Sequence, residues 1–331
     1  MTLSAAPLFT DDWTLAGSLV SLAAGAVVVV ALARLADLEA RDPGGQRLEE
    51  QRHAGQGLVG QGLEGPALEG QTLKGRDLAG RGLRGWRSAG TRAVVALLLW
   101  PMSVFLVAGY DETLFLAFAI PAWLAARRGR WPMAAVLAAG ASCVRITGLF
   151  LALALVVEFF GARGSVRRAG WLVVPFAPLL ILSVYQHARG GDWLAWGQAQ
   201  QAGWGRHLVW PWESLAATWQ SAMADGRFVW MFRMELAGAL VGIGLVLLLL
   251  YLRRWSELVY VGLQAGALIL SASYLSIPRS ALLWWPIFVL VAGASVRGPR
   301  GRWWVIAVYA LVTAPLMALN TLTFLDSVLA G

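Results

Sequence analysis

Apolar residues occur along this chain in long blocks, which short polar or basic segments separate. The blocks recur from residue 14 to the end, and several are long enough to cross a bilayer as helices. Hydrophobic residues make up 58% of the 331 residues and charged residues 14%, which is more apolar surface than a soluble core of this length needs. The pattern predicts an all-α polytopic membrane protein of about ten transmembrane or half-membrane helices.

The basic residues predict which connecting segments face the cytoplasm. The formal net charge is +8, and the arginines gather in short clusters between apolar blocks, as in cytoplasmic loops. The clusters are Arg127, Arg128 and Arg130; Arg163, Arg167 and Arg168; Arg253 and Arg254; and Arg297, Arg300 and Arg302. Topology therefore explains the positive charge, and we expect no nucleic-acid partner.

Two stretches that flank the first of these clusters must leave the cytoplasm and return. The stretch 131–160 has only 30 residues, whereas two complete spans need about 40. Its arms must be short, and its turn falls near residues 143–148, with Arg145 at or just below the outer surface. The stretch 93–126 forms a second hairpin with Asp111 and Glu112 at its tip. The two hairpins therefore bring three charged side chains to one outer level.

The remaining apolar blocks complete the predicted topology. We expect further crossings at about residues 169–186, 229–252, 255–274, 281–295 and 303–325. A short external tip, SIPRS, then carries Arg279, and residues 187–228 form an external loop. Residues 1–37 contain the first span and an external N-terminus, residues 38–92 a cytoplasmic insert, and residues 93–331 a multi-span membrane domain.

The insert contains a low-complexity stretch at residues 56–85. Leucine recurs there with period five, each time followed two places on by glycine. The pattern resembles a pentapeptide-repeat coil, but positions that must be small and inward carry residues such as Gln56, Pro66 and Arg76. We therefore interpret the insert as a flexible glycine-rich segment without a catalytic role.

The sequence contains few residues that could bind a metal ion or form a disulfide. Cys143 is the one cysteine, so no internal disulfide can form. The three histidines, His53, His187 and His207, lie too far apart in sequence for the usual metal-ligand spacings. We expect neither a metal site nor a cofactor.

Charged side chains near a membrane interior are costly and frequently functional, so those at the outer tips are candidate site residues. Asp111 and Glu112 also have a structural explanation, as a helix cap and a favourable charge in the first helical turn. Arg145 can reach the headgroups or pair with a carboxylate, and the same holds for Arg279. The convergence of three tips on one side favours a functional site.

The segment 191–215, GDWLAWGQAQQAGWGRHLVWPWESL, is rich in tryptophan. Tryptophan belongs at membrane interfaces, so an interfacial amphipathic helix is one explanation. Indole faces also stack on sugar rings, and Arg206 or His207 can meet a phosphate. Trp204, Trp210 and His207 are therefore candidate sugar or lipid contacts.

Four stretches carry a resemblance to a known family: WPMSVFLVAGYDETLFLAF, RRGRWPMAAVLAAGASCVRITGLFLAL, WGRHLVWPWESL and IPRSALLWWPIF. In this order they resemble the PIG-V-type mannosyltransferases, the family of the eukaryotic second GPI mannosyltransferase, within the GT-C superfamily of membrane glycosyltransferases. The family signature of tyrosine, serine or threonine, glutamate, serine, leucine and phenylalanine maps onto residues 110–115, with Asp111 and Thr113 as variations. Its later arginines match Arg145 and Arg279.

The resemblance implies an inverting transfer of a sugar, mannose in this family, from a polyprenyl-phosphate donor to an extracytoplasmic acceptor. The resemblance and the residue patterns together give the candidate site residues: Glu112 and Asp111 as catalytic carboxylates, Arg145, Arg279 and Arg206 as donor phosphate contacts, and Tyr110, Trp204, His207 and Trp210 as sugar or lipid contacts. The implied partners are membrane lipid, the lipid-linked donor and a glycan, lipid or protein acceptor. The donor is a substrate, and no further cofactor is implied.

One departure from the superfamily pattern keeps an alternative open. GT-C enzymes usually carry their principal aspartate in the first external loop, and we expect this chain to lack the first span and that loop. Asp11 and Asp12 lie on the predicted outer side, but their sequence does not match the family pattern. The alternative is a catalytically inactive GT-C-like protein that binds lipid-linked sugars or scaffolds a partner. A transporter is disfavoured, because the charges cluster at one face rather than at the midplane.

Overall fold

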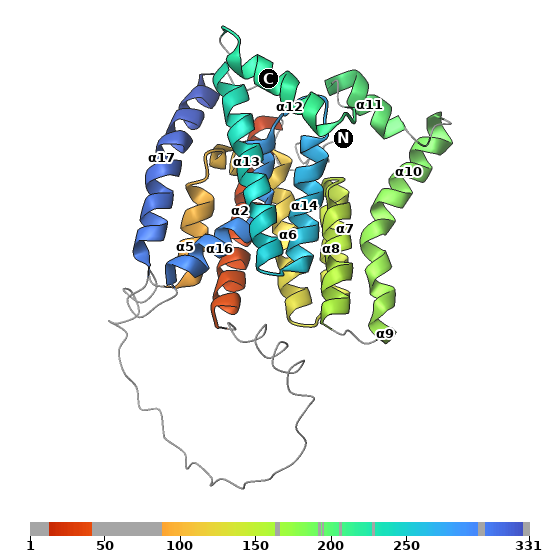
Figure 1. Cartoon of the computed structure of the whole chain (residues 1–331). Helices are drawn as coiled ribbons and strands as arrows, with labels where there is room; N and C mark the ends of the chain where they lie inside the picture. Colours follow the sequence, from red (N-terminus) through yellow and green to blue (C-terminus); the bar gives the residue numbers. More distant parts are fainter. Residues whose placement is uncertain are drawn as a thin grey trace, which may run out of the picture.

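The apolar blocks of the sequence form helices, since a chain in lipid must satisfy its backbone hydrogen bonds internally. The computed structural model describes residues 13–41, 88–162, 166–190, 193, 195–204, 207–226, 229–296 and 302–326. These residues contain helices and no named strand, and a single isolated β-bridge joins Leu208 to Ser271. The prediction of an all-α protein is confirmed. Figure 1 shows most of the helices running alongside one another in a bundle, with connections at its two ends.

Within the described residues, four helical segments are long and apolar enough to cross a membrane. They are α2 (Trp13–Arg41), the segment Arg167–Gly190, α13 (Val229–Tyr251) and α17 (Trp303–Leu325). The segment Arg167–Gly190 joins the end of α9 (Val166–Ala169) to η2 (Gly170–Phe176) and α10 (Ala177–Gly190). A bent pair adds a fifth span if it is counted as one: Ile277–Leu283 and Trp285–Val296 (α16) meet at 69°. The chain is thus a membrane protein.

In the part of the chain that the structure describes, the four or five candidate spans are fewer than the predicted ten or so transmembrane or half-membrane helices, because several helices of the bundle are short. These are α5 (Ala89–Leu98), α6 (Asp111–Arg127), α7 (Trp131–Val144), α8 (Gly148–Gly161) and α14 (Trp255–Ile269). A helix of 14 residues, such as α7 or α8, is only about 21 Å long, against about 30 Å for the hydrocarbon core. The prediction that residues 131–160 form a hairpin with short arms is confirmed, and its turn lies at residues 145–147.

Close packing of small residues against large aromatic ones holds the short helices together. Helix α6 packs between α2 and α7, and α8 packs against α14. The side chains of Trp123, Trp285 and Tyr260 are fully buried, and the ring centroids of Tyr260 and Trp285 lie 4.1 Å apart. Gly242 lets the Trp284 ring approach α13, because a Cβ at this glycine would lie 2.8 Å from the ring. The short helices are therefore fixed by burial within the bundle.

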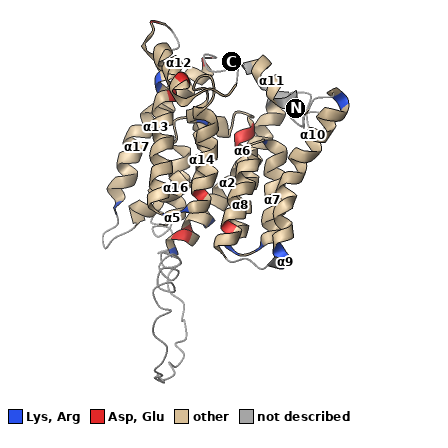
Figure 2. Cartoon of the chain, turned by 45° about the vertical axis from the view of Figure 1, so that its right-hand side comes forward, with Lys and Arg blue, Asp and Glu red and all other residues tan. Residues whose placement is uncertain are grey.

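Ion pairs form at one end of the bundle, around the arginine-rich turns before α7 and α14. The guanidinium of Arg254 contacts Glu257 and lies 2.7 Å from a carboxylate oxygen of Glu39, near the end of α2. Arg127 at the end of α6 pairs with Glu158 at 3.1 Å. Figure 2 shows acidic and basic residues at the end of the bundle near α9, opposite the end that carries α12. The described basic clusters before α7 and α14 therefore share one end.

Two predicted domain boundaries differ from the helices. Helix α2 continues past residue 37 to Arg41, and α5 already begins at Ala89, so both ends of the predicted insert are helical. The remainder of the insert, residues 42–87, lies outside the described residues, as do Asp11 and Asp12. The predicted external loop 187–228 is largely helical, since it contains α11 (Ala195–Trp204) and α12 (Pro211–Met223). The packing of α12 on α13 explains this difference: a segment that lies against the bundle can be helical without spanning.

Candidate functional site

The two predicted carboxylates lie in the first turn of α6. Tyr110 takes the extended N-cap conformation, and Asp111 and Glu112 follow as the first two helical residues. Carboxylates are favoured there by the positive end of the helix dipole. The two side chains differ in exposure, since the Glu112 side chain is 0% exposed and the Asp111 side chain 39%. Only Asp111 is thus open to a ligand from outside.

Backbone contacts fix this tip against its neighbours. Gly109 has a positive φ of 79°, which favours glycine, and it turns the chain between η1 (Ser103–Leu106) and α6. The hydroxyl of Thr113 donates to the carbonyl of Leu106 at 2.7 Å. The hydroxyl of Ser21 on α2 donates to the carbonyl of Tyr110 at 3.5 Å. The tip is therefore tied both to its own hairpin and to α2.

Arg145 leaves the end of α7 at the turn of the hairpin that α7 and α8 form. It is the C-cap residue and is extended, with φ −141° and ψ 144°. Its Nη1 lies 2.6 Å from Asp111 Oδ1 and 2.9 Å from Glu112 Oε1. The turn is tight, because a Cβ at Gly148 would lie 2.4 Å from Ser142 Cα. The α7–α8 hairpin thus places Arg145 beside the two carboxylates at the start of α6.

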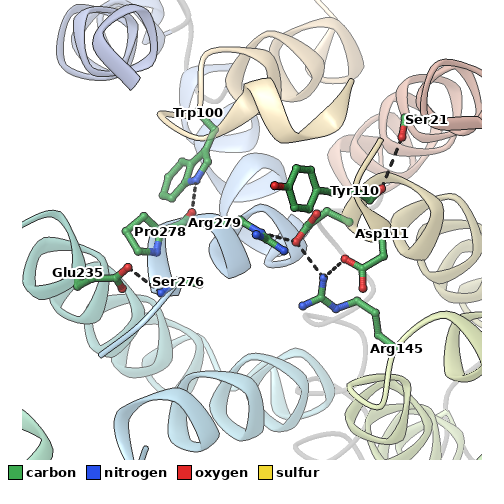
Figure 3. Close-up of polar contacts among 10 residues, drawn as sticks. Ser21, Trp100, Tyr110, Asp111, Arg145, Glu235, Ser276, Pro278 and Arg279 are labelled. Atoms are coloured by element: carbon green, nitrogen blue, oxygen red, sulfur yellow. Dashed lines mark hydrogen bonds and ion pairs between the residues drawn. The ribbon is translucent and has the colours of Figure 1, made fainter. Parts of the chain in front are cut away.

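Arg279 reaches the same carboxylates from the short helix α15 (Ile277–Ser280). Both oxygens of Glu235, on α13, cap this helix by accepting from the backbone N–H groups of Ser276 and Ile277, each at 2.7 Å. The carbonyl of Pro278 accepts from the Trp100 indole N–H at 2.8 Å. These bonds hold α15 in place, and Figure 3 draws those of Glu235 to Ser276 and of Trp100 to Pro278.

The guanidinium of Arg279 contacts both a carboxylate and two aromatic rings. Its Nε lies 2.7 Å from Glu112 Oε1. Its Cζ lies 4.5 Å from the ring centroid of Tyr110 and 4.9 Å from that of Phe105, distances typical of cation–π contacts. Figure 3 shows Arg279 and Arg145 approaching the start of α6 from different sides. Arg279 is thereby held in one orientation.

The cluster of Asp111, Glu112, Arg145 and Arg279, here called the tip cluster, balances two negative charges against two positive ones. Glu112 Oε1 accepts from both arginines, whereas Glu112 Oε2 has no hydrogen-bond partner within the described residues. Of the described groups, the Arg145 guanidinium uses only Nη1 and the Arg279 guanidinium only Nε. A guanidinium has five N–H donors, so both arginines keep donors for a further anion.

The other predicted site residues belong to the tryptophan-rich segment. The ring of Tyr110 lies against the guanidinium of Arg279, as described above. The carbonyl of His207 accepts from Ala272 N–H at 3.1 Å, which ties its backbone to the segment leading into α15. Trp210 is 63% exposed and stacks on Trp212 with ring centroids 5.0 Å apart. Arg206 and the side chain of Trp204 lie outside what the structure describes.

Sequence reasoning missed the residues that position Arg279. Glu235 is a single carboxylate inside the apolar segment Val229–Tyr251, and that isolation is a signal that could have marked it. Trp100 and Phe105 carry no comparable signal, because aromatic residues are common in apolar blocks. Their contacts depend on tertiary packing between α5, η1 and α15.

Comparisons with known proteins assign no family to the chain. No family model matches it, and neither a curated protein nor a solved structure matches it. Among the described residues, no group of three or more His, Cys, Asp or Glu side chains could hold a metal ion. The resemblance to PIG-V-type mannosyltransferases therefore rests on the sequence stretches alone.

Proposed function

We propose that this protein is a membrane glycosyltransferase that moves a sugar, mannose by the resemblance, from a polyprenyl-phosphate donor to an extracytoplasmic acceptor. The observation that supports it most is the tip cluster. Hairpins and a capped helix from three separate parts of the chain place two arginines on one pair of carboxylates. The described basic clusters lie at the opposite end of the bundle, which by the positive-inside rule favours an extracytoplasmic site.

The two arginines suit the phosphate of the donor. Each guanidinium is oriented by a carboxylate through one nitrogen and keeps further N–H donors, as described above. The arginine side chains are 19% and 28% exposed at Arg145 and Arg279, so a lipid phosphate can reach them. Planar guanidinium groups bind phosphate oxygens in pairs. A phosphate bound there would be stabilised as it leaves carrying negative charge.

The exposed carboxylate suits the acceptor. In an inverting transfer the acceptor hydroxyl oxygen attacks the anomeric carbon, and the bond from that carbon to the phosphate oxygen breaks. The electron pair of that bond leaves with polyprenyl phosphate, and the hydroxyl proton passes to a carboxylate base. We assign this role to Asp111, because its side chain is 39% exposed. An inverting transfer needs the base and the leaving phosphate on opposite sides of the sugar, so Asp111 has to part from Arg145, whose Nη1 lies 2.6 Å from Asp111 Oδ1, when the donor binds.

Glu112 is better suited to positioning than to taking the proton. Its side chain is 0% exposed, and Oε1 already accepts from Arg145 and Arg279. Without this carboxylate the two guanidinium groups would repel one another and move apart. Tyr110, Trp204, His207 and Trp210 remain proposed contacts to the sugar or the lipid. Arg206 remains a proposed contact to the donor phosphate.

A transfer assay with purified full-length protein in proteoliposomes tests the proposal. Transfer from radiolabelled polyprenyl-phosphate mannose is compared between the wild type, Asp111→Asn and Arg145→Gln. We expect each substitution to lower the transfer rate by about a hundredfold or more. Arg128→Gln, an exposed change at the opposite end of the bundle, is the matched control and should leave the rate unchanged.

One observation favours the alternative of a non-catalytic protein that binds lipid-linked sugars or scaffolds a partner. Glu112 is fully buried between two arginines, and such a neutral cluster can stabilise a fold without any chemistry. Donor binding that depends on Arg145, without any consumption of the donor, would support this alternative. Unchanged transfer in the variants of an active protein would remove the tip cluster from the mechanism.

A further inference from the structure

Helix α12 exposes its large apolar side chains, and the residues that it buries are small. The exposed residues, here called the α12 stripe, are Trp212, Leu215, Trp219 and Met223, with exposures of 62%, 45%, 54% and 54%. The buried residues are Ser214, Thr218 and Ala222, each 0% exposed. A helix on a water-soluble protein has the reverse arrangement, with its large apolar side chains inside. The stripe therefore needs an apolar partner outside the bundle.

The helix in fact has three faces. At about 100° per residue, the buried residues and the stripe fall on adjacent faces that lie roughly 110° apart. Glu213 and Gln220 are exposed on a third face, roughly another 100° around the helix axis from the stripe. One face thus packs on protein, one is apolar and exposed, and one is polar and exposed. A helix lying in the plane of a membrane surface shows this division.

Contacts on the buried face prevent the helix from turning its stripe inward. The Thr218 hydroxyl accepts from the backbone N–H of Tyr274 at 2.8 Å, and this bond is buried. The chain just before α12 pairs with the same linker, because Val209 N–H donates to the Leu270 carbonyl at 2.9 Å. Small side chains on this face allow α12 to pack closely on α13. The orientation of the stripe is therefore fixed by the bundle.

The surroundings of the stripe are those of a bilayer boundary. Helix α12 crosses the end of the bundle that carries the tip cluster, and the chain leads from it into the span α13 (Figure 1). Trp230 at the start of α13 is 41% exposed, so exposed indole continues from α12 into this span. The exposed Arg233 donates to the Ala222 carbonyl at 3.2 Å. Its positive charge beside the end of the stripe is complementary to phospholipid phosphates.

We propose that α12 is an in-plane anchor whose stripe inserts into the boundary between headgroups and acyl chains of the phospholipid bilayer. The occupant of this surface is lipid rather than a second copy of the chain. Tryptophan is the residue most typical of this boundary, and the stripe is continuous with the exposed apolar surface of a span. Thr218 of the anchor and Val209 just before it also bond to the linker 270–276, which leads into α15 and Arg279.

Spin labels on the full-length protein in phosphatidylcholine and phosphatidylglycerol nanodiscs test this proposal. In a Cys143→Ser background, a label is placed at Leu215→Cys on the stripe or at Gln220→Cys on the polar face of the same helix. The measurement compares collisions with oxygen, which concentrates in lipid, and with a water-soluble nickel chelate. We expect the Leu215 label to collide several-fold more with oxygen than with nickel, and the Gln220 label to show the reverse.

Two other outcomes would overturn the proposal. Equal and high nickel accessibility at both labels would place the stripe in water. Protection of the Leu215 label from both reagents would mean that protein covers the stripe, either a second copy or another part of the chain. Neither result depends on glycosyl transfer, so failure of this proposal and failure of the proposed function can be told apart.

A second measurement keeps the test independent of the labelled variants. Brominated phospholipids quench the fluorescence of tryptophan that lies among the acyl chains. Trp219→Phe, which keeps an apolar ring in the stripe, should lower the quenchable fraction of the total emission relative to the wild type. Trp123→Phe, at a fully buried position, is the control and should leave that fraction unchanged or raise it. An unchanged quenchable fraction in Trp219→Phe would contradict insertion.

Discussion

At the scale of single residues, Glu112 holds the candidate site together. One oxygen of this fully buried carboxylate accepts from two guanidinium groups that arrive from distant parts of the chain. Burying a charge is costly unless it is paired, and removing one partner of a buried pair leaves the others uncompensated. The two carboxylates of the tip cluster should therefore differ strongly in their contribution to stability.

We predict that Glu112→Ala lowers the free energy of unfolding by about 3 kcal/mol, because two half-buried guanidinium groups lose their shared, fully buried partner. Asp111→Ala should cost about 1 kcal/mol or less, since the Asp111 side chain is 39% exposed and its ion pair is screened by solvent. Equilibrium unfolding in mixed micelles measures both values. Equal losses in the two variants would mean that Glu112 is not the centre of the cluster.

Arg279 offers a test of geometry at constant charge. Lysine in its place keeps the positive charge but loses the planar group that lies over Tyr110 and Phe105. We expect Arg279→Lys to weaken the binding of polyprenyl phosphate about tenfold or more, as measured by displacement of a fluorescent analogue. Arg128→Lys is the matched control and should bind normally. Normal binding by Arg279→Lys would exclude a paired contact between Arg279 and the phosphate.

At the scale of elements, the turn between α7 and α8 decides where Arg145 lies. A Cβ at Gly148 would come within 2.4 Å of Ser142 Cα, whereas a Cβ at Gly161, at the other end of α8, would meet nothing within 4 Å. We predict that Gly148→Ala lowers the free energy of unfolding by about 1–3 kcal/mol through overpacking and weakens donor binding by displacing Arg145.

Gly161→Ala supplies the matched control for this prediction. It makes the same chemical change at the opposite end of the same helix, where space is open. Alanine is the better helix former, so stability should stay unchanged or rise slightly. If Gly148→Ala were as stable as Gly161→Ala in mixed micelles, the close approach of the two helices would be refuted.

The sequence predicts these elements well where local pattern decides them. The basic residues before Trp131 and after Phe160, with only 30 residues between, require a hairpin with short arms, and the structure has one. The tryptophan-rich pattern suggested an interfacial amphipathic helix within residues 191–215 but did not give the bounds of α12, because its apolar stripe faces outward and its buried face holds only small residues. The surface on which such a helix packs is known only from the structure.

At the scale of the whole molecule, the two ends of the bundle carry different chemistry. One end gathers arginines and the Glu39–Arg254 ion pair, and the other carries the tip cluster and α12. The sequence placed Asp111, Glu112 and Arg145 at one level through the positive-inside rule. It could not show that Arg279 shares the carboxylate of Glu112, because this contact depends on how Glu235 caps α15.

This division of the molecule predicts the response to a membrane-impermeant thiol reagent in intact cells. In a Cys143→Ser background, a cysteine in place of Gln220 on α12 should react from outside, and a cysteine in place of Arg128 should react only after the membrane is opened. Both positions are exposed on the protein. The opposite order of labelling would place the tip cluster on the cytoplasmic side.

The most direct test of the central claim is the fate of the donor itself. Purified wild-type protein in proteoliposomes is incubated with polyprenyl-phosphate mannose and a mixture of membrane acceptors, and the products are separated and analysed by NMR. We predict release of polyprenyl phosphate together with a new mannoside of inverted anomeric configuration. A donor that binds through Arg145 but stays intact would contradict catalysis and leave a protein that binds lipid-linked sugars.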